Sequence, residues 1–331
     1  MRTNMSRRAA VAGLLAAGVA LFSTGCGEDS GPRASDGQLT KVAVGVQPTA
    51  PFSVVPLGVE QGIFKKYGLD VEIKIISTAS TMPPAVLADQ LQFSNWSFPS
   101  FAALADKKLP LKIIGAGDTA GRGEADDYIQ LISLADGGVT SVSQLAGKKV
   151  AVNSLASLTE VQIKAALKAA GVDPASVELV PIPFPDQFAA LAAKRVDAIG
   201  AGEPFLTAAK QKAKVNFLSA LDAAVMPDLP LSLWMTSERF LQQNPKAVRA
   251  FQLALKESLE YAKSNPDKVR AFMPGFAKVD EAVAKAMILP NWTSEVDMVK
   301  VQQIVTIMHE YGVVPSAPDL SPYMTQFPLP E

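Results

Sequence analysis

The chain has 331 residues, of which 48% are hydrophobic, and its formal net charge is −1. This length and composition allow two domains with cores of their own, and the nearly balanced charge argues against a nucleic-acid partner, which would need a basic face or stripe. The single cysteine, Cys26, and the single histidine, His309, exclude an intramolecular disulfide and a metal site built from several cysteines or histidines. We therefore expect neither a metal nor a cofactor.

The N-terminus has the residue order of an export signal. Arg2, Arg7 and Arg8 precede an apolar run over residues 9–22. This run is too short to cross about 30 Å of hydrocarbon, so it predicts a cleaved signal peptide over residues 1–25 and not a membrane span. The general secretory route and the twin-arginine route are both compatible with this segment.

Cys26 follows Gly25 directly, an arrangement that resembles a bacterial lipobox. Ser23 departs from that pattern, which usually has an aliphatic residue there. The pattern favours lipidation of Cys26, with ordinary signal-peptidase cleavage as the alternative. Residues 26–39 are rich in Gly, Ser, Asp and Pro and predict a lipidated tether to the membrane.

Beyond the tether, hydrophobic periodicity and Gly and Pro punctuation predict strands and helices that alternate, which is typical of parallel sheets. The Gly-rich segment 117–123 is expected to be a loop. The C-terminal part is expected to be helical, with one helix starting at Pro245 and a last helix ending before Gly312. Strands are predicted over residues 42–46, 71–76, 91–94, 111–116, 128–133, 148–152, 177–182, 196–199 and 229–235, and further helices over 56–66, 82–88, 100–105, 157–170, 188–194 and 295–311.

One pattern occurs twice, over residues 65–94 and residues 168–199. Each copy ends a helix at a glycine, Gly68 or Gly171, where a left-handed cap needs no side chain, and continues as strand, helix and strand. The repeat predicts two similar α/β lobes. A cleft between two lobes is a natural place to bind a small molecule.

A series of short motifs follows in order along the middle of the chain. The motifs are Ser143–Ser154, Leu167–Gly171, Pro183–Asp186, Ala189–Ala193, Val196–Ala198 and Glu203–Phe205. Together they resemble the extracytoplasmic solute-binding proteins of ABC importers, in the group that handles nitrate, sulfonates such as taurine, and thiamine-precursor pyrimidines. The similarity extends over residues 42–311.

The resemblance implies a two-lobed periplasmic-binding-protein fold of type II, in which each lobe is a mainly parallel sheet flanked by helices. Two hinge segments would cross between the lobes, near residues 128–133 and 229–235. Lobe 1 would then be discontinuous, with residues 40–127 and 236–331, and lobe 2 would comprise residues 128–235.

The function that the resemblance implies is capture of a small organic solute outside the cytoplasm and its delivery to the transmembrane subunits of an ABC permease. A sulfonate or a related anion is favoured, and a pyrimidine or other aromatic ligand is the alternative. The protein would be a monomer that a lipid anchor holds at the outer face of the cytoplasmic membrane.

Candidate ligand-binding residues follow from the rule that ligands lie beyond the carboxyl ends of the strands in α/β sheets, often at helix N-termini. Amides and hydroxyls there suit an anionic head, an aromatic side chain can stack on a planar ligand, and a carboxylate could bind an amine. For Ser157 the simpler interpretation is a helix N-cap, and for Trp96 it is burial in the core. The candidates are Gln47, Pro48, Ser94, Asn95, Trp96, Asn153, Ser154, Ser157, Thr159, Glu203 and Trp234.

Two other classes of function fit the sequence less well. A family of related fold synthesises the thiamine pyrimidine with histidine chemistry and a cysteine-rich motif, but here His309 lies on the last predicted helix and Cys26 in the export signal. The carboxylates and lysines show no distinctive catalytic spacing, so we expect no enzyme activity. A sensor ectodomain would need a transmembrane helix and a signalling domain, for which the sequence shows no pattern.

Overall fold

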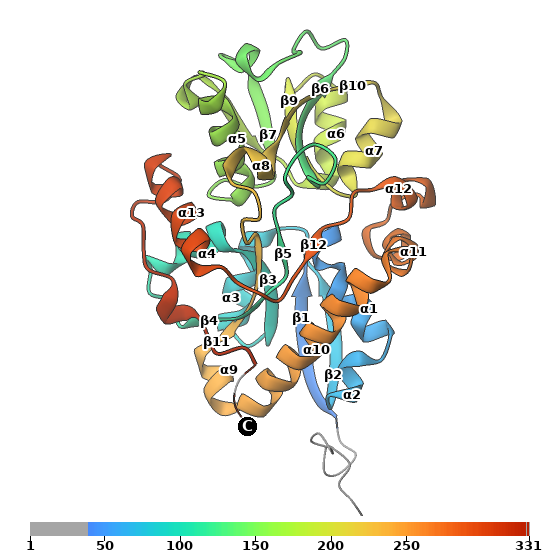
Figure 1. The fold of residues 1–331 in the computed structure, drawn as a ribbon, viewed down its shortest axis with the longest axis vertical. Coiled ribbons are helices and arrows are strands. Elements are labelled where there is room, and N and C mark those ends of the chain that lie inside the picture. The colour runs from blue at the N-terminus through green and yellow to red at the C-terminus, as the bar shows by residue number, and fades with distance from the viewer. Residues whose placement is uncertain (1–38, 329, 331) are drawn as a thin grey trace, which may run out of the picture. The chain divides into compact units, whose positions relative to one another are not determined.

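The computed structural model describes residues 39–328 and residue 330. The predicted signal peptide, Cys26 and nearly all of the predicted tether lie outside the described residues. The described body contains two five-stranded sheets, each with helices packed against it (Figure 1). The prediction of two α/β lobes is therefore confirmed.

The first sheet has the strand order β2-β1-β3-β11-β4. Strand β1 runs parallel to β2 and β3, whereas β11 runs antiparallel to both of its neighbours. The sheet is therefore mainly parallel, as expected, and its one antiparallel strand, β11, arrives from the other lobe. The strands are β1 (Thr40–Val46), β2 (Leu69–Ile75), β3 (Phe93–Ser97), β4 (Leu111–Ala116) and β11 (Ser232–Ser237).

The second sheet repeats this arrangement. Its order, β8-β7-β9-β6-β10, places β7 parallel to β8 and β9, and β6 antiparallel to both of its neighbours. In each sheet the antiparallel strand is thus the one that follows a crossing from the other lobe. The strands are β6 (Ile129–Leu134), β7 (Lys149–Val152), β8 (Glu178–Pro181), β9 (Ala198–Gly202) and β10 (Val215–Ala220).

The chain crosses between the lobes over residues 120–128 and returns over residues 226–231. The crossings were expected slightly later, where the structure has β6 and β11 inside the sheets. The two crossing segments are hydrogen-bonded to each other, since the backbone N–H of Ala120 donates to the carbonyl of Leu229 at 2.8 Å. The short strand β5 (Asp118–Thr119) precedes the first crossing and pairs with β12 (Asn291–Trp292).

Helices cover both faces of each sheet. In the first lobe α1, α2 and α10 share one core with β1 and β3, and α3, α4 and α13 pack on the opposite face. In the second lobe α6 and α7 cover one face and α5 and α8 the other. The helices are α1 (Val54–Glu60), α2 (Ile63–Lys66), α3 (Met82–Leu87), α4 (Phe98–Ala105), α5 (Leu158–Ala169), α6 (Phe184–Ala192), α7 (Phe205–Lys212), α8 (Leu221–Val225), α9 (Glu238–Gln243), α10 (Pro245–Ser264), α11 (Pro266–Ala277), α12 (Glu281–Ala286) and α13 (Met298–Glu310).

Local sequence signals explain several of these boundaries. Gly68 and Gly171 both have positive φ, of 80° and 73°, as the doubled cap pattern predicts. Gly62, with φ 77°, splits the single helix predicted over residues 56–66 into α1 and α2. Helix α10 begins at Pro245, where a missing N–H costs nothing, and buries the apolar stripe that its sequence predicts.

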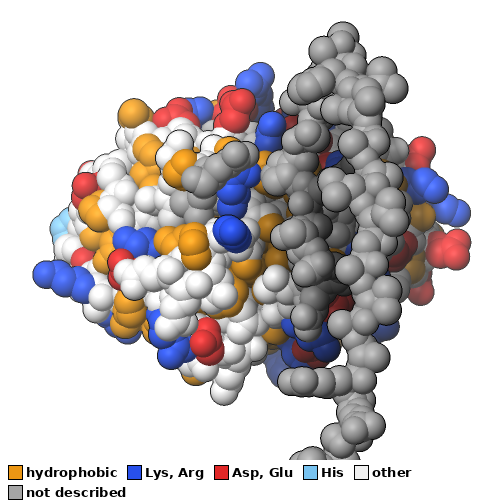
Figure 2. Space-filling model, turned by 90° about the horizontal axis from the view of Figure 1, so that it is seen from below, with side chains coloured by type: hydrophobic (Ala, Val, Ile, Leu, Met, Phe, Trp, Pro, Cys, Tyr) orange, Lys and Arg blue, Asp and Glu red, His pale blue; other side chains and the backbone are white. Residues whose placement is uncertain are grey.

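None of the described helices is long and apolar enough to span a membrane. On the face seen in Figure 2, basic and acidic side chains are interspersed and do not gather into a stripe of one sign. Among the described residues no cluster of three His, Cys, Asp or Glu side chains is placed to hold a metal ion.

Candidate functional site

A cavity lies between the two lobes, at the carboxyl ends of strands from both sheets. Its volume of about 70 Å³ is room for several waters or one small solute, since a single water requires about 10–15 Å³. Its walls are mostly apolar and aromatic, with hydroxyl and amide groups among them. The lining residues are Gln47, Thr49, Pro51, Phe52, Trp96, Ser97, Ser100, Tyr128, Ile129, Asn153, Ser154, Ser157, Leu158, Thr159, Phe184, Gly202, Glu203, Leu231 and Ser232.

Most of the candidate residues predicted from the sequence lie at this cavity. Pro48 lines a smaller hollow that shares several of its walls with the cavity. The predicted residues in the cavity lining itself are Gln47, Trp96, Asn153, Ser154, Ser157, Thr159 and Glu203.

Three of the candidates are buried behind the lining instead. Asn95 accepts a hydrogen bond from the backbone N–H of Gln47 at 3.1 Å, and Trp234 packs edge-on against Phe52, with ring centroids 6.4 Å apart. The Ser94 hydroxyl donates to a methionine sulfur at 2.9 Å. Asn95 and Trp234 thus support the lining residues Gln47 and Phe52 from behind. Ser94 and Asn95 lie inside a strand and not in a loop because β3 extends to Ser97, beyond the strand end predicted at residue 94.

The first turn of α5 faces the cavity. Ser157 is the N-cap, and its side-chain oxygen accepts from the backbone N–H of Glu160 at 3.3 Å while its proton goes to the Ser154 carbonyl at 2.7 Å. Leu158 and Thr159 open the helix and line the cavity. The first backbone N–H groups of a helix have no partner within it and carry the positive end of its dipole, so this turn favours a ligand oxygen.

Glu203 lines the cavity but its carboxylate is already engaged. It accepts from the backbone N–H and the hydroxyl of Thr207, at 3.1 and 2.7 Å, and from the backbone N–H of Ile288 at 3.1 Å. Burial raises the pKa of Glu203. Its carbonyl also accepts from the backbone N–H of Ala50 in the first lobe, at 3.2 Å. Glu203 therefore joins the second lobe to the first at the cavity wall.

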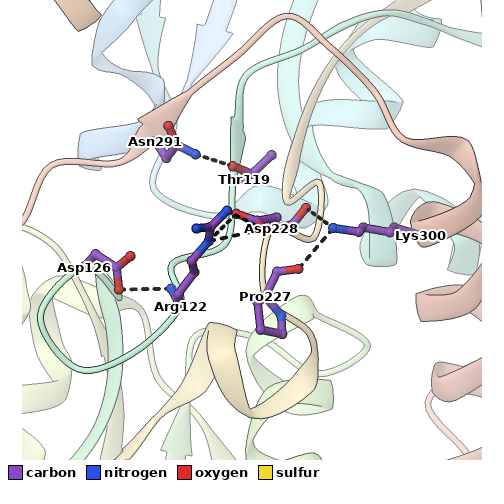
Figure 3. Close-up of polar contacts among 7 residues, drawn as sticks. All are labelled: Thr119, Arg122, Asp126, Pro227, Asp228, Asn291 and Lys300. Atoms are coloured by element: carbon purple, nitrogen blue, oxygen red, sulfur yellow. Dashed lines mark hydrogen bonds and ion pairs between the residues drawn. The ribbon is translucent and has the colours of Figure 1, made fainter.

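The two crossing segments are also linked by side chains at the surface (Figure 3). The Arg122 guanidinium binds the Asp228 carboxylate, with the closest nitrogen and oxygen 2.9 Å apart. This hydrogen bond lowers the pKa of Asp228. Lys300 donates to the carbonyl of Pro227 at 3.2 Å. Arg122 is 73% exposed and does not line the cavity, so it belongs to the hinge and not to the ligand site.

No lysine, arginine or histidine is found among the described residues that line the cavity. Its polar groups are hydroxyls, amides, the buried carboxylate of Glu203 and the start of α5. The lining therefore offers hydrogen bonds and aromatic contacts, and no basic side chain for an ion pair.

The sequence profile of the NMT1/THI5 like family matches residues 52–269 of this chain. The chain belongs to this family. Two similar proteins are a binding protein of Brucella abortus, 23% identical over 70% of this chain and 69% of its own length, and the taurine-binding periplasmic protein of Escherichia coli, 24% identical over 61% of each chain.

Solved structures show the same fold. The alkanesulfonate-binding protein SsuA from Xanthomonas axonopodis superposes with a TM-score of 0.74 at 12% identity, covering 88% of this chain and 99% of that protein. The nitrate-binding protein NrtA from Synechocystis superposes with a TM-score of 0.71 at 17% identity, covering 85% and 84%. The predicted periplasmic-binding-protein fold is thereby confirmed for this NMT1/THI5-like chain.

Sequence reasoning missed several lining residues of this family member. Tyr128 and Ser232 stand at the ends of the two crossings, where the sequence pattern shows only strands. Phe52 lies on a short 3-10 helix before α1, and Phe184 begins α6 directly after the two-residue loop from β8. The signal that was available for these four residues is their position just beyond a strand or at a crossing, combined with an aromatic or hydroxyl side chain.

Proposed function

We propose that this chain is the solute-binding protein of an ABC importer, which captures a small organic solute in the interlobe cavity and delivers it to the permease. The observation that carries the proposal is a cavity whose walls come from both lobes of a hinged fold. A solute that contacts both lobes favours the closed state by its differential affinity. The names of its relatives, which include taurine-binding and nitrate-binding proteins, support this function.

A sulfonate or a related organic anion is the favoured ligand. The first turn of α5, with Leu158 and Thr159, would receive the anionic oxygens, and the apolar walls would hold the organic part. The alternative is a pyrimidine or similar aromatic solute, which the rings of Phe52, Trp96 and Phe184 would enclose. Bare nitrate fits less well, because it has no apolar part for these walls.

We infer a binding role without catalysis. The Glu203 carboxylate, which could otherwise serve as an acid or base, is held by Thr207 and Ile288. The named relatives are binding proteins, which supports the same conclusion.

The first test is a thermal-shift panel of alkanesulfonates, nitrate, pyrimidines and aromatic acids, followed by calorimetry on any hit. A ligand at a hundred times its dissociation constant should add about 2.7 kcal/mol of stability, a shift of several degrees. Asn153→Ala removes a lining side chain and should reduce the shift, whereas Gln243→Ala, at an exposed position of α9 outside the cavity, should preserve it. If no compound of the panel raises the melting temperature, the proposed ligand classes are contradicted.

Hinge closure is tested separately by small-angle scattering with and without a saturating ligand. Closure should reduce the radius of gyration when the ligand is present. Identical profiles in both conditions would refute the hinge mechanism while leaving binding itself intact.

The predicted location is extracytoplasmic, with Cys26 lipidated and the protein monomeric on the outer face of the cytoplasmic membrane. Cys26→Ser should release the protein from membranes without changing its melting temperature, because the strands and helices that the structure describes begin at Thr40. Ser23→Leu, which restores the usual lipobox residue, is the matched control and should remain bound to the membrane. Unchanged membrane retention of Cys26→Ser would refute lipidation.

A further inference from the structure

A carboxylate outside the cavity controls two hydroxyls that line it. Asp118 is fully buried in β5, and its two oxygens accept one hydrogen bond each, from the Tyr128 hydroxyl and from the Ser232 hydroxyl. Both Tyr128 and Ser232 line the cavity, whereas Asp118 does not. Tyr128 ends the first crossing, Ser232 follows the second crossing directly, and Asp118 lies in the strand before the first, so the group is assembled where the two crossings meet the first lobe.

The backbone around Asp118 holds this arrangement in place. The carbonyl of Asp118 accepts from the backbone N–H of Leu231 at 3.0 Å, and β5 pairs with β12. The Asn291 side chain donates to the Thr119 hydroxyl at 2.7 Å beside it (Figure 3). At Gly117 a Cβ atom would lie 2.4 Å from the Ser232 hydroxyl oxygen, so only glycine leaves that hydroxyl room to reach Asp118.

The number of hydroxyl protons left over decides whether Tyr128 and Ser232 can donate hydrogen bonds to a ligand or only accept them. Burial raises the pKa of Asp118 to about 6, so the carboxyl group is mainly ionised at neutral pH and only accepts hydrogen bonds. A hydroxyl has a single proton, and both protons are donated to Asp118. Only oxygen lone pairs remain on Tyr128 and Ser232 for a bound solute.

The Glu203 carboxylate is a further acceptor, and it keeps lone-pair capacity beyond the three hydrogen bonds that it accepts. No basic side chain is present among the described lining residues to supply hydrogen-bond donors in place of these acceptors. A solute that presents only acceptor atoms here would leave these oxygens unpaired and would be repelled by them.

We propose that Asp118 is a positioning residue that sets ligand specificity: by taking both hydroxyl protons it makes Tyr128 and Ser232 acceptors, so the solute carries an N–H or O–H donor at its hinge end. The class is an organic solute with an amine, amide, amino-heteroaromatic or hydroxyl group. This inference rests on the proposed solute-binding function and narrows its ligand. Within the sulfonates it selects amino-sulfonates over plain alkanesulfonates.

The test compares matched probes of equal charge that differ only in a donor group. The probe 2-hydroxyethanesulfonate is paired with propanesulfonate, and 4-aminopyrimidine with 4-methylpyrimidine, by isothermal titration of the purified full-length chain in detergent at pH 7.5. Within a pair that binds, the dissociation constant of the donor-bearing member should be lower by about ten-fold or more. The reason is that a buried acceptor without a hydrogen-bond partner weakens binding by about this factor. Equal binding of both members would overturn the inference and leave the proposed function intact. If no member of either pair binds, the proposed function for these classes is overturned and the inference with it.

Variants then assign the selectivity to Asp118. In Asp118→Asn the side-chain amide donates to one of the hydroxyls, whose proton then points toward the cavity. The ratio of the two dissociation constants within a pair should therefore fall toward one. Ser232→Ala removes one acceptor and should lower the preference in part, which provides a second test if Asp118→Asn does not fold.

The matched control is Asp127→Asn. Asp127 is also fully buried at the hinge, but its carboxylate accepts from the backbone N–H groups of Ile129, Asp222 and Ala223 and from no lining hydroxyl. Asp127→Asn should preserve the preference for the donor-bearing probe. A similar loss of preference in Asp127→Asn and Asp118→Asn would show a merely structural effect and would overturn the assignment.

Discussion

Lowering the pH from 7 to 5 is expected to stabilise this protein against urea. Burial raises the pKa of Asp118 to about 6 in the folded state, above its ordinary value of 3.8. Between these two values the folded state binds more protons than the unfolded state, so the free energy of unfolding falls as the pH rises. The penalty for burying the charge is therefore fully present above pH 6 and is relieved as the pH falls toward 4.

The magnitude follows from the same two pKa values. Between pH 7 and pH 5 one such carboxyl group changes the free energy of unfolding by about 1 kcal/mol. Burial also raises the pKa of Asp127 to about 6, and the pKa of the neighbouring Asp222 is raised further by burial and by these two carboxylates. Tyr128, which faces Asp118, has a raised pKa and stays protonated throughout. From pH 7 to pH 5 the free energy of unfolding of the wild type should therefore rise by about 2 kcal/mol or more in total. This rise corresponds to an increase of several tenths of a molar in the urea concentration at the unfolding midpoint.

The assay is urea unfolding at pH 5 and pH 7 for the wild type, Asp118→Asn and Asp228→Asn. Asp118→Asn should lose about 1 kcal/mol of the stabilisation at low pH, whatever its stability at pH 7. Asp228→Asn should keep the whole effect, because its hydrogen bond with Arg122 lowers the pKa of Asp228 below this range. The same pH response in Asp118→Asn and in the wild type would refute the reasoning.

Three further predictions concern packing and the cavity wall. Phe251→Ala removes a fully buried ring that stacks on another phenylalanine at 4.0 Å, and should cost about 3–5 kcal/mol in urea unfolding. Gly58→Ala places a Cβ atom 2.1 Å from the Ser258 hydroxyl oxygen and should cost about 1–3 kcal/mol; Ser258→Gly should restore part of this, and no recovery would contradict the clash. Phe184→Ala should weaken binding of a panel hit by about ten-fold in calorimetry, whereas Phe188→Ala, on the same helix but outside the lining, should not.

Much of the fold was predictable because its signals are local. Positive φ at Gly68 and Gly171, the start of α10 at Pro245 and the limits of β4 all depend on residues that are close together in the chain. The repeat itself was visible for the same reason, since each copy is a run of helix, strand, helix and strand. Strand direction was not local: β6 and β11 are antiparallel in otherwise parallel sheets because each enters from the other lobe.

The site was predictable only in part. Loops after parallel strands must gather at one edge of a sheet, so the sequence alone predicted that Asn153 and Ser154 lie at a shared site. In the structure both residues line the cavity. Asn95 was placed in such a loop, but it pairs with Trp234 across β3 and β11 and is buried behind Gln47. That pairing joins residues far apart in the chain, so no local pattern contains it.

The sequence by itself determined the two-lobed α/β architecture, the family, and the loops from which a ligand site would be built, because periodicity, caps and strand ends are encoded within short segments. Only the tertiary structure decided which hydroxyls face the cavity and in which sense they form hydrogen bonds. Asp118, Tyr128 and Ser232 meet through two chain crossings, and the polarity of a hydroxyl depends on the partner that takes its proton. The specificity inferred for this protein therefore depends on contacts between segments that are distant in the chain.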